Sequence, residues 1–364
     1  KILNEPIFRQ KKIKKKKEEK LTIEVTKDFI NYLYKNIYPL IKMDDAGLDV
    51  LGKFYTEFIR YAGSSKAQGL VLTPSHITDF FCDLANITVD SRVYDPCCGS
   101  GGFLIAAMKR MLKLAGADTV KKKYIKNNQL IGVEIRPDMF TYACSNMIFR
   151  GDGRSNIYND DCDNVKMQVI KKHNPNVVFL NPPYDIGNSD QMEFIEHGLQ
   201  VVSKTNGVVV AIVQMSCAIG NERDLIAVKE RLLTKNRLRA VISMPDELFN
   251  PSSSVPTCIM IWDANIPNNA ETWFGFLKDD GFEKRKYKGR IDAKKKWSVI
   301  KDKFLKAYYN QKQIAGLSIK RHVTATDEWC AEAYMKTDYS TLSIKNFEDV
   351  VKEFYAYKYI FNNG

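Results

Sequence analysis

The chain has 364 residues, of which 45% are hydrophobic and 27% charged, a composition typical of a globular protein with room for about two or three domains. Its formal net charge of +12 favours a polyanionic partner, because lysines and arginines that neutralise phosphates release counterions. No apolar stretch approaches the roughly 18–20 residues of a membrane span, and no signal-peptide pattern opens the chain. We therefore expect a cytoplasmic, bacterial-type protein that associates with the nucleoid and not with a membrane.

The eight cysteines are scattered and form no C-x-x-C pair, and none of the four histidines has zinc-ligand spacing to a cysteine. The pattern predicts reduced thiols and no metal site. The chain opens with Lys1 instead of Met, which indicates a truncated N-terminus.

Residues 1–68 are expected to form a helical N-terminal region, with amphipathic patterns at 29–41 and 50–63. The lysine run at 11–20 is either a solvated arm or a phosphate contact, and the sequence leaves both possibilities open.

Residues 69–265 alternate short apolar runs with helical patterns at 101–114, 137–149, 190–203 and 222–235. Such alternation predicts an α/β domain with a doubly wound, mostly parallel, seven-stranded sheet. The expected strands are 93–95, 130–134, 156–159, 177–180, 207–213, 240–243 and 258–262.

Residues 266–364 begin with a Pro/Asn-rich linker at 266–270 and become more polar. We expect a helical C-terminal extension that contacts other subunits and DNA. Apolar residues in 342–361 recur near helical spacing, so this stripe needs a partner surface, either within the chain or on another one.

The first expected strand ends at Asp95 and runs into a glycine-rich turn formed by Gly99, Ser100 and Gly101. Glycines allow a ligand to approach the backbone closely, and the helix start that follows offers unpaired N–H groups. A dinucleotide fingerprint would need glycine at position 104, which is Leu104. The acid repels a pyrophosphate and suits a cationic ligand such as S-adenosylmethionine, whereas a simple strand-to-helix turn is the alternative.

Acids also follow the next two expected strands. Glu134 could accept hydrogen bonds from both hydroxyls of a ribose, although a lone strand-end acid is more often a plain surface charge. Asp160 or Asp161 could reach an adenine amino group, and the other would then cap a turn.

The run NVVFLNPPYD (176–185) ends a buried strand with Asn181, Pro182, Pro183 and Tyr184. Neither proline can donate to a strand ladder, so Asn181 and Tyr184 lie at the carboxyl end of the strand, where open α/β sheets bind ligands. An ordinary Asn-Pro turn is the structural alternative.

Taken together, these motifs resemble the N6-adenine DNA methyltransferases, and more narrowly the modification subunit of type I restriction-modification systems or a solitary relative. Stretches 49–63, 245–262, 279–282 and 327–340 extend the resemblance along the chain. Cys97 departs from the usual Ala or Thr without an expected effect on cofactor binding. The motifs are TP (73–74), DPCCGSGGF (95–103), GVE (132–134), DD (160–161) and NPPY (181–184).

The resemblance implies S-adenosylmethionine as cofactor and double-stranded DNA as substrate, with a specificity subunit and a restriction nuclease subunit as further partners. It implies catalytic roles for Asn181, Pro182, Pro183, Tyr184 and Phe249. The residues that it implies for cofactor binding are Thr73, Pro74, Asp95, Gly99, Ser100, Gly101, Glu134, Asp160 and Asp161.

The expected chemistry is that of a poor nucleophile, because the lone pair of an exocyclic adenine amine is delocalised into the ring. The Asn181 oxygen and the Pro182 carbonyl can accept its two N–H bonds and localise that lone pair, while Pro183 stiffens the turn. Tyr184 stacks on an adenine flipped out of the duplex. Phe249 matches the second stacking aromatic of the family, although on its own it would be a core residue.

Two other functions share parts of this pattern. NPPY also occurs in enzymes that methylate a glutamine side chain in proteins, but the TP motif and the basic surplus argue against that substrate. A DNA-binding scaffold that has lost catalysis is the second alternative, which the intact Asp95, Glu134, Asn181 and Tyr184 disfavour. Cytosine N4 methyltransferases more often carry Ser at the position of Asn181.

Overall fold

A computed structural model describes residues 23–36, 72–149, 156–165, 170, 172–250, 253–285, 289–336 and 342–361. The chain divides into two compact units, residues 1–61 and 62–364. In the first unit the described helix is α1 (Ile23–Asn36), which overlaps the pattern expected at 29–41. The expected helix at 50–63 and the lysine run at 11–20 lie outside the described residues.

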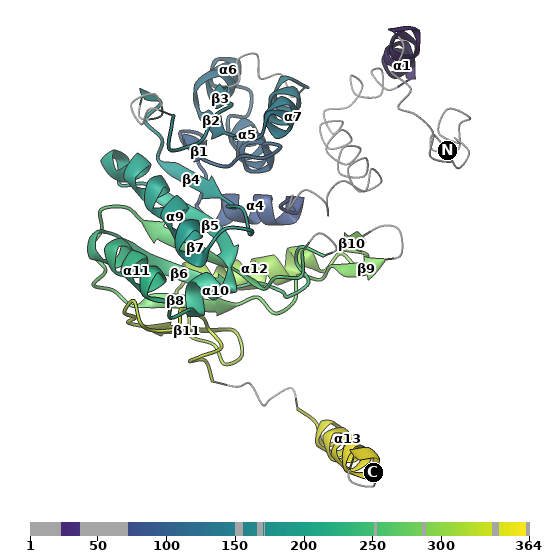
Figure 1. Ribbon diagram of the computed structural model, residues 1–364, viewed down its shortest axis with the longest axis vertical. Coiled ribbons are helices and arrows are strands. Elements are labelled where there is room, and N and C mark those ends of the chain that lie inside the picture. Colours follow the sequence, from purple (N-terminus) through teal and green to yellow (C-terminus); the bar gives the residue numbers. More distant parts are fainter. Residues whose placement is uncertain are drawn as a thin grey trace. The chain divides into compact units, whose positions relative to one another are not determined.

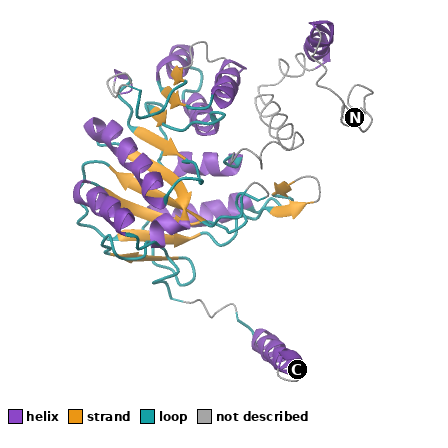
Figure 2. Cartoon of the chain, viewed as in Figure 1, coloured by secondary structure: helices purple, strands orange, loops and turns teal. Residues whose placement is uncertain are grey.

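The second unit is built on a central sheet with helices on both faces (Figures 1 and 2). In the described part of the chain this sheet has nine strands, and their order across it is β11-β8-β6-β7-β5-β4-β1-β2-β3. The strands are β1 (Val93–Asp95), β2 (Leu130–Val133), β3 (Asn156–Tyr158), β4 (Val177–Leu180), β5 (Val208–Gln214), β6 (Arg237–Ser243), β7 (Thr257–Asp263), β8 (Thr272–Phe276) and β11 (Ser318–Arg321).

The central strands are fully buried because their apolar runs are covered on both faces. All pairs from β3 through β5 are parallel, whereas β7 runs antiparallel to both β5 and β6. The order reverses on either side of β1, which pairs with β2 and β4, and this is where a doubly wound sheet opens a ligand site at its carboxyl edge.

An apolar core lies on each face of the sheet, between the sheet and the helices that cover that face. The helices of one face are α4 (Ser75–Leu84), α5 (Gly102–Leu114), α6 (Thr119–Asn128), α7 (Pro137–Phe149) and α12 (Trp297–Tyr309). Those of the other face are α9 (Asn188–Val202), with the short 3-10 helix η3 (Ser203–Thr205) after it, α10 (Met215–Ile219) and α11 (Arg223–Lys235). The doubly wound α/β fold predicted from the sequence is confirmed.

The strand number and the nature of the C-terminal extension differ from expectation. We expected seven strands and a helical segment from residue 266, but β8 pairs with β6 in parallel and β11 pairs with β8. These two strands cover the β6 edge, which would otherwise expose unpaired backbone groups. The extension is therefore mixed: α12 and α13 (Ile344–Phe361) are helical, while β9 (Glu283–Arg285) and β10 (Gly289–Ile291) form a hairpin.

No helix among the described residues is both long enough and apolar enough to span a membrane.

Candidate active site

The sequence-predicted acids and the NPPY motif converge at one edge of the sheet. β1 ends in Asp95, β2 is followed by Glu134, and β4 is followed by Asn181. Because β4, β1, β2 and β3 are parallel neighbours, their carboxyl ends lie side by side. Asp160 and Asp161, which follow β3, belong to the same edge.

The glycine turn between β1 and α5 has a backbone that requires glycine. Gly99 has φ +54° and Gly101 has φ +83°, both in the left-handed region that side chains disfavour. The Gly99 N–H donates to Oε2 of Glu134 at 2.8 Å, and the Arg136 N–H donates to Oε1 at 2.8 Å. Glu134 is thus fixed against the turn by two backbone donors, and each oxygen keeps acceptor capacity for a ribose.

Asp95 is buried at the base of this turn. Its Oδ1 accepts the Cys97 N–H at 3.1 Å, whereas Oδ2 is buried without a hydrogen-bond partner among the described residues. Burial raises the pKa of Asp95 to about 8, and the nearby Glu134 adds to the effect. A buried acceptor of this kind fits a cationic ligand, which would supply both the missing hydrogen bond and the compensating charge.

The Asn181 amide is oriented by the segment that precedes α4. Its Nδ2 donates to the Thr73 hydroxyl at 3.0 Å, across 108 positions of sequence. Thr73 and Pro74 are in turn fixed by the start of α4, where the Pro74 carbonyl accepts the N–H groups of Ile77 and Thr78. In this arrangement the Nδ2 end of the amide points to the Thr73 hydroxyl, and Oδ1 is the acceptor atom of the side chain. Pro182 is buried and Pro183 is exposed.

Tyr184 and Phe249 are brought together from β4 and the loop after β6. Their ring centroids lie 5.7 Å apart at 82°, an edge-to-face contact. Phe249 is part of the buried core, while Tyr184 is half-buried. Burial raises the pKa of the Tyr184 hydroxyl well above its ordinary value, so the ring remains neutral. The structure therefore brings the two aromatic candidates into contact with each other, three residues after Asn181 in the case of Tyr184, and their rings meet edge to face and not as a parallel stack.

The family model for N-6 DNA methylases matches residues 46–338. The chain belongs to the N-6 DNA methylase family. It is 36% identical to the type II restriction enzyme and methyltransferase RM.BcgI of Heyndrickxia coagulans, over 86% of this chain and 50% of that protein. It is 24% identical to the HindI methylase subunit, a type I restriction enzyme component of Haemophilus influenzae, over 64% of this chain and 56% of that protein. The chain thus spans about half the length of these curated relatives.

Solved structures share the fold of this chain. A chain from a study of the assembly of the type I R-M system superimposes with a TM-score of 0.68 at 19% identity, covering 93% of this chain and 74% of that one. A type I methyltransferase subunit from Streptococcus thermophilus gives a TM-score of 0.56 at 19% identity, covering 73% and 59%. At these identities the likeness extends to the fold alone.

The cofactor is S-adenosylmethionine, and the residues present fit it. The buried Oδ2 of Asp95 offers an acceptor for a cationic group, Gly99 and Gly101 allow close approach, and Glu134 faces the same turn. Ser100 contributes its carbonyl to Asn146 Nδ2 at 3.0 Å, which ties the turn to α7.

The structure leaves the choice between Asp160 and Asp161 open. Asp160 is exposed, and its Oδ1 accepts the N–H of Asp161 at 2.8 Å. Asp161 is half-buried, and its Oδ1 accepts the N–H of Asp163 at 3.1 Å. Both carboxylates thus accept a hydrogen bond in a local turn and keep further acceptor capacity. Either could therefore accept a hydrogen bond from the adenine amino group of the cofactor.

Sequence reasoning missed a buried polar triad beside the site, formed by His76, Asp280 and Arg290. His76 Nε2 lies 3.0 Å from Asp280 Oδ2, and Arg290 donates to both Asp280 oxygens at 2.6 and 3.0 Å. Burial acts to raise the pKa of Asp280, but the hydrogen bonds from His76 and Arg290 outweigh it, and the pKa is lowered. The DDGF motif (279–282) was a signal for Asp280, although not for its partners.

A possible ligand set for a metal also escaped the sequence reading. The ligand atoms of Cys162, Asp163 and His197 lie within 4.8 Å of one another, on the α9 face of the sheet. His197 Nε2 is 3.0 Å from the Tyr94 hydroxyl, and Asp163 is exposed. The cluster joins segments far apart in sequence, so spacing could not reveal it, and the expectation of no metal stays a prediction.

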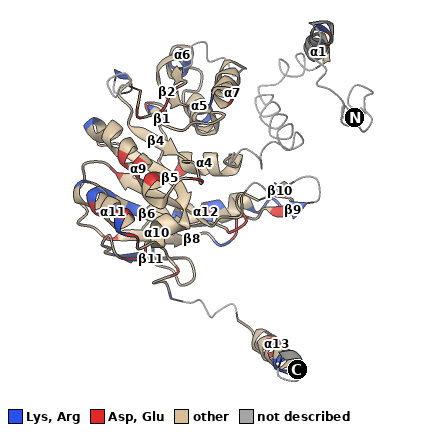
Figure 3. Ribbon diagram, viewed as in Figure 1, with Lys and Arg blue, Asp and Glu red and all other residues tan. Residues whose placement is uncertain are grey.

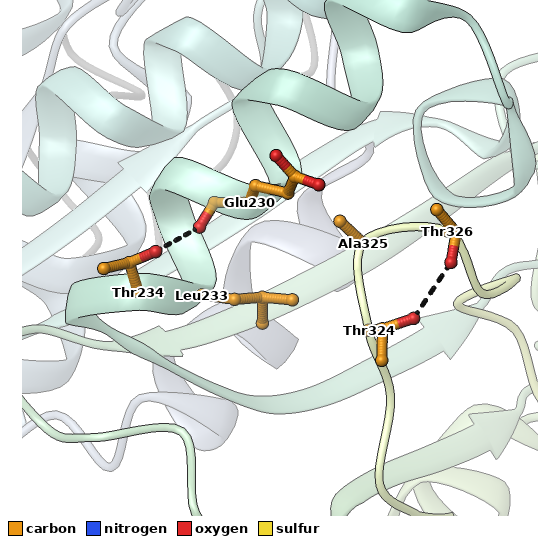
Figure 4. Close-up of a pocket in the computed structure, with 6 residues that line it drawn as sticks. All are labelled: Glu230, Leu233, Thr234, Thr324, Ala325 and Thr326. Atoms are coloured by element: carbon orange, nitrogen blue, oxygen red, sulfur yellow. Dashed lines mark hydrogen bonds between the residues drawn. The ribbon is translucent and has the colours of Figure 1, made fainter.

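An open pocket lies away from these residues (Figure 4). It is formed at the C-terminal end of α11 and the loop after β11, near the amino end of β6, whereas the NPPY motif lies at the carboxyl edge of the sheet. Its hydrogen bonds are internal, such as Thr234 to the Glu230 carbonyl at 2.7 Å. We assign it no role in the chemistry. Its lining residues are Glu230, Leu233, Thr234, Thr324, Ala325 and Thr326.

Proposed function

We propose that the chain is the methyltransferase module of a restriction-modification system and transfers a methyl group to the N6 amine of an adenine in double-stranded DNA. The observation that supports this most directly is the Asn181 amide, held by Thr73 at the carboxyl end of β4 beside the turn that contains Asp95. A planar, weakly nucleophilic nitrogen needs hydrogen-bond acceptors in fixed positions, because they localise its lone pair. The Asn181 oxygen is one such acceptor.

The proposed mechanism assigns one task to each residue. Bound S-adenosylmethionine supplies an electrophilic methyl group on a sulfonium. Asn181 Oδ1 and the Pro182 carbonyl accept the two N–H groups of adenine N6 and aim its lone pair at the methyl carbon. The sulfonium would serve as the leaving group of the transfer, with S-adenosylhomocysteine as the second product. The N6 proton is then lost to water, so the chain needs no strong base.

The target base is held by the aromatic pair. We propose that Tyr184 stacks on the flipped adenine and that Phe249 closes the pocket from the loop after β6. Glu134 would bind the ribose of the cofactor, and either Asp160 or Asp161 would bind its adenine.

A separate recognition subunit is the partner that we propose for sequence specificity. Apolar side chains on α13 are exposed in the described structure, among them Ile344, Phe347, Val350, Val351 and Phe354. Several relatives are named methylase subunits, and one structural neighbour comes from an assembled type I R-M system. We propose that α13 packs on the recognition subunit in an assembly that includes a restriction nuclease, in the bacterial cytoplasm.

The decisive experiment expresses the gene with its neighbouring genes in a host that lacks adenine methylation. We expect N6-methyladenine in the DNA nucleosides by mass spectrometry, and none with Asn181→Ala. Methylated glutamine in a host protein without modified DNA would favour the protein methyltransferase alternative. Failure of the wild-type chain to bind S-adenosylmethionine in a calorimetric titration would favour the silent scaffold.

The partner proposal has its own test. Phe347→Ser with Val351→Ser should abolish co-purification with the recognition subunit while leaving the affinity for S-adenosylmethionine unchanged. Retained co-purification would exclude α13 as the docking surface.

A further inference from the structure

The segment 283–296 concentrates positive charge at a defined place in the fold. It contains eight Lys and Arg residues and two acids, and its described part forms the β9–β10 hairpin and the turn into α12. Lys284, Arg285 and Lys294–Lys296 are exposed. The hairpin projects beyond the edge of the sheet in Figure 1, and in Figure 3 its ribbon is coloured blue at Lys and Arg and red at an acid. We call Lys284, Arg285 and Lys294–Lys296 the basic hairpin surface.

Much of this charge is not neutralised by neighbours. Glu283 pairs with Arg285 and Lys294, and Asp292 accepts the N–H groups of Lys296 and Trp297. Among the described residues no ion pair involves Lys284, Lys295 or Lys296. A surface that existed only for solubility would interleave both signs of charge, whereas here three of the five exposed cations have no acid paired with them among the described residues.

The base of the hairpin is fixed by buried groups, which a surface loop that served only solubility would not need. Arg290 in β10 makes two hydrogen bonds to Asp280, which has no exposed surface. Asp280 also bonds His76 at the start of α4, and the His76 ring stacks on Phe282 at 3.8 Å between centroids. Burying an ion pair costs desolvation free energy, so the pair need not stabilise the fold. It indicates instead that the position of the hairpin matters.

The same arginine connects the hairpin to the target-base pocket. Arg290 Nη1 donates to the Leu248 carbonyl at 3.3 Å, and the next residue, Phe249, contacts Tyr184. His76 lies three positions after Thr73, the residue that orients Asn181. The basic hairpin surface therefore starts beside the two side chains that would enclose a flipped base.

We propose that the basic hairpin surface contacts the phosphate backbone of duplex DNA next to the target adenine; this rests on the proposed function and names a surface for it. Lysines contact phosphates as point charges and carry no sequence information, so the surface positions the duplex over the pocket without reading bases. Sequence would be read elsewhere.

The test compares two variants that lose the same charge. Lys284→Gln, Lys295→Gln and Lys296→Gln are combined in one chain. In the control, Lys113→Gln, Lys122→Gln and Lys123→Gln change residues of α5 and α6. Fluorescence anisotropy measures the Kd of a labelled duplex between 50 and 200 mM salt, and a calorimetric titration measures the affinity for S-adenosylmethionine.

We expect the hairpin variant to bind DNA on the order of tenfold more weakly at low salt. The slope of log Kd against log salt should fall by about 2–3, since each lost phosphate contact removes about 0.9. Cofactor affinity should be unchanged, and the control should keep the wild-type slope. An unchanged slope in the hairpin variant, or equal losses in both variants, would overturn this proposal while leaving the proposed function intact. A wild-type chain without salt-dependent binding to DNA would likewise overturn this proposal, whereas the proposed function is overturned by the absence of N6-methyladenine when the gene is expressed with its neighbouring genes.

Discussion

Replacing Thr73 tests whether the orientation of Asn181 controls methyl transfer. Thr73→Val keeps the shape of the side chain but removes the acceptor of the 3.0 Å bond from Asn181 Nδ2. A neutral hydrogen bond contributes about 0.5–1.5 kcal/mol net, and a partly buried donor left without a partner costs about 1–3 kcal/mol. Without this bond the amide can rotate and present its NH₂ to the substrate. We therefore expect the methyl-transfer rate to fall by about tenfold, close to 1.4 kcal/mol.

The matched control is Thr73→Ser, which keeps the hydroxyl and should retain the rate within about twofold. Single-turnover methylation by the native complex, with saturating S-adenosylmethionine and DNA, isolates this step from binding. A parallel titration separates the two roles of Thr73, because a contact to the cofactor would weaken its affinity in the Val variant. Wild-type rates in Thr73→Val, or an equal loss in Thr73→Ser, would refute the orienting role.

Four further outcomes follow from the same geometry. Asn181→Ala should leave cofactor affinity nearly unchanged and lower turnover by two or more orders of magnitude, on the order of 3 kcal/mol, and wild-type turnover would remove it from the mechanism. Gly101→Val should abolish S-adenosylmethionine binding in a calorimetric titration, because its φ of +83° is strained for valine; native affinity would make the turn merely structural. Burial raises the pKa of Asp95 to about 8, so affinity for the cationic cofactor should increase from pH 6 to pH 8 as the carboxylate forms, with proton release on binding. Asp95→Asn should bind weakly, and a pH dependence like that of wild type would contradict this assignment. Asp280→Ala leaves Arg290 buried without its acid and should lower the free energy of unfolding by about 3–5 kcal/mol in urea titrations, whereas a loss below 1 kcal/mol would show that the pair relaxes.

The central strands were predictable because each is a short apolar run between turn signals. All seven expected strands are present, and their ends shift by at most a few residues: the run predicted at 240–243, for example, extends back to Arg237 as β6. β8 was missed because Thr272–Phe276 follows a Pro/Asn-rich linker and is short enough to belong to a loop or a helix. Its strand conformation depends on pairing with β6, a long-range contact that local pattern does not encode.

In the site, too, local features could be predicted and long-range contacts could not. The position of each motif relative to a strand end was readable from sequence, so the edge at which Asp95, Glu134 and Asn181 meet could be inferred from the parallel order. The contacts that fix these groups could not, because they join distant segments. Thr73 lies 108 positions from Asn181, and His76 lies 204 positions from Asp280.

The two missed contacts share one short segment, and this explains how the site is held together. Thr73 precedes α4 and orients Asn181, while His76 lies in the first turn of α4 and bonds Asp280. Burial lowers the pKa of His76, so the imidazole is neutral near pH 7 and acts as a fixed hydrogen-bonding group and stacking surface, not as a charge. Through Arg290, the same triad reaches the loop that carries Phe249. The start of α4 is therefore tied both to Asn181, the proposed acceptor of the target amine, and to the loop that carries Phe249, the proposed wall of its pocket. The groups that would do the chemistry lie between residues 95 and 249, and those that position them lie on either side, which is consistent with a family model that extends over residues 46–338.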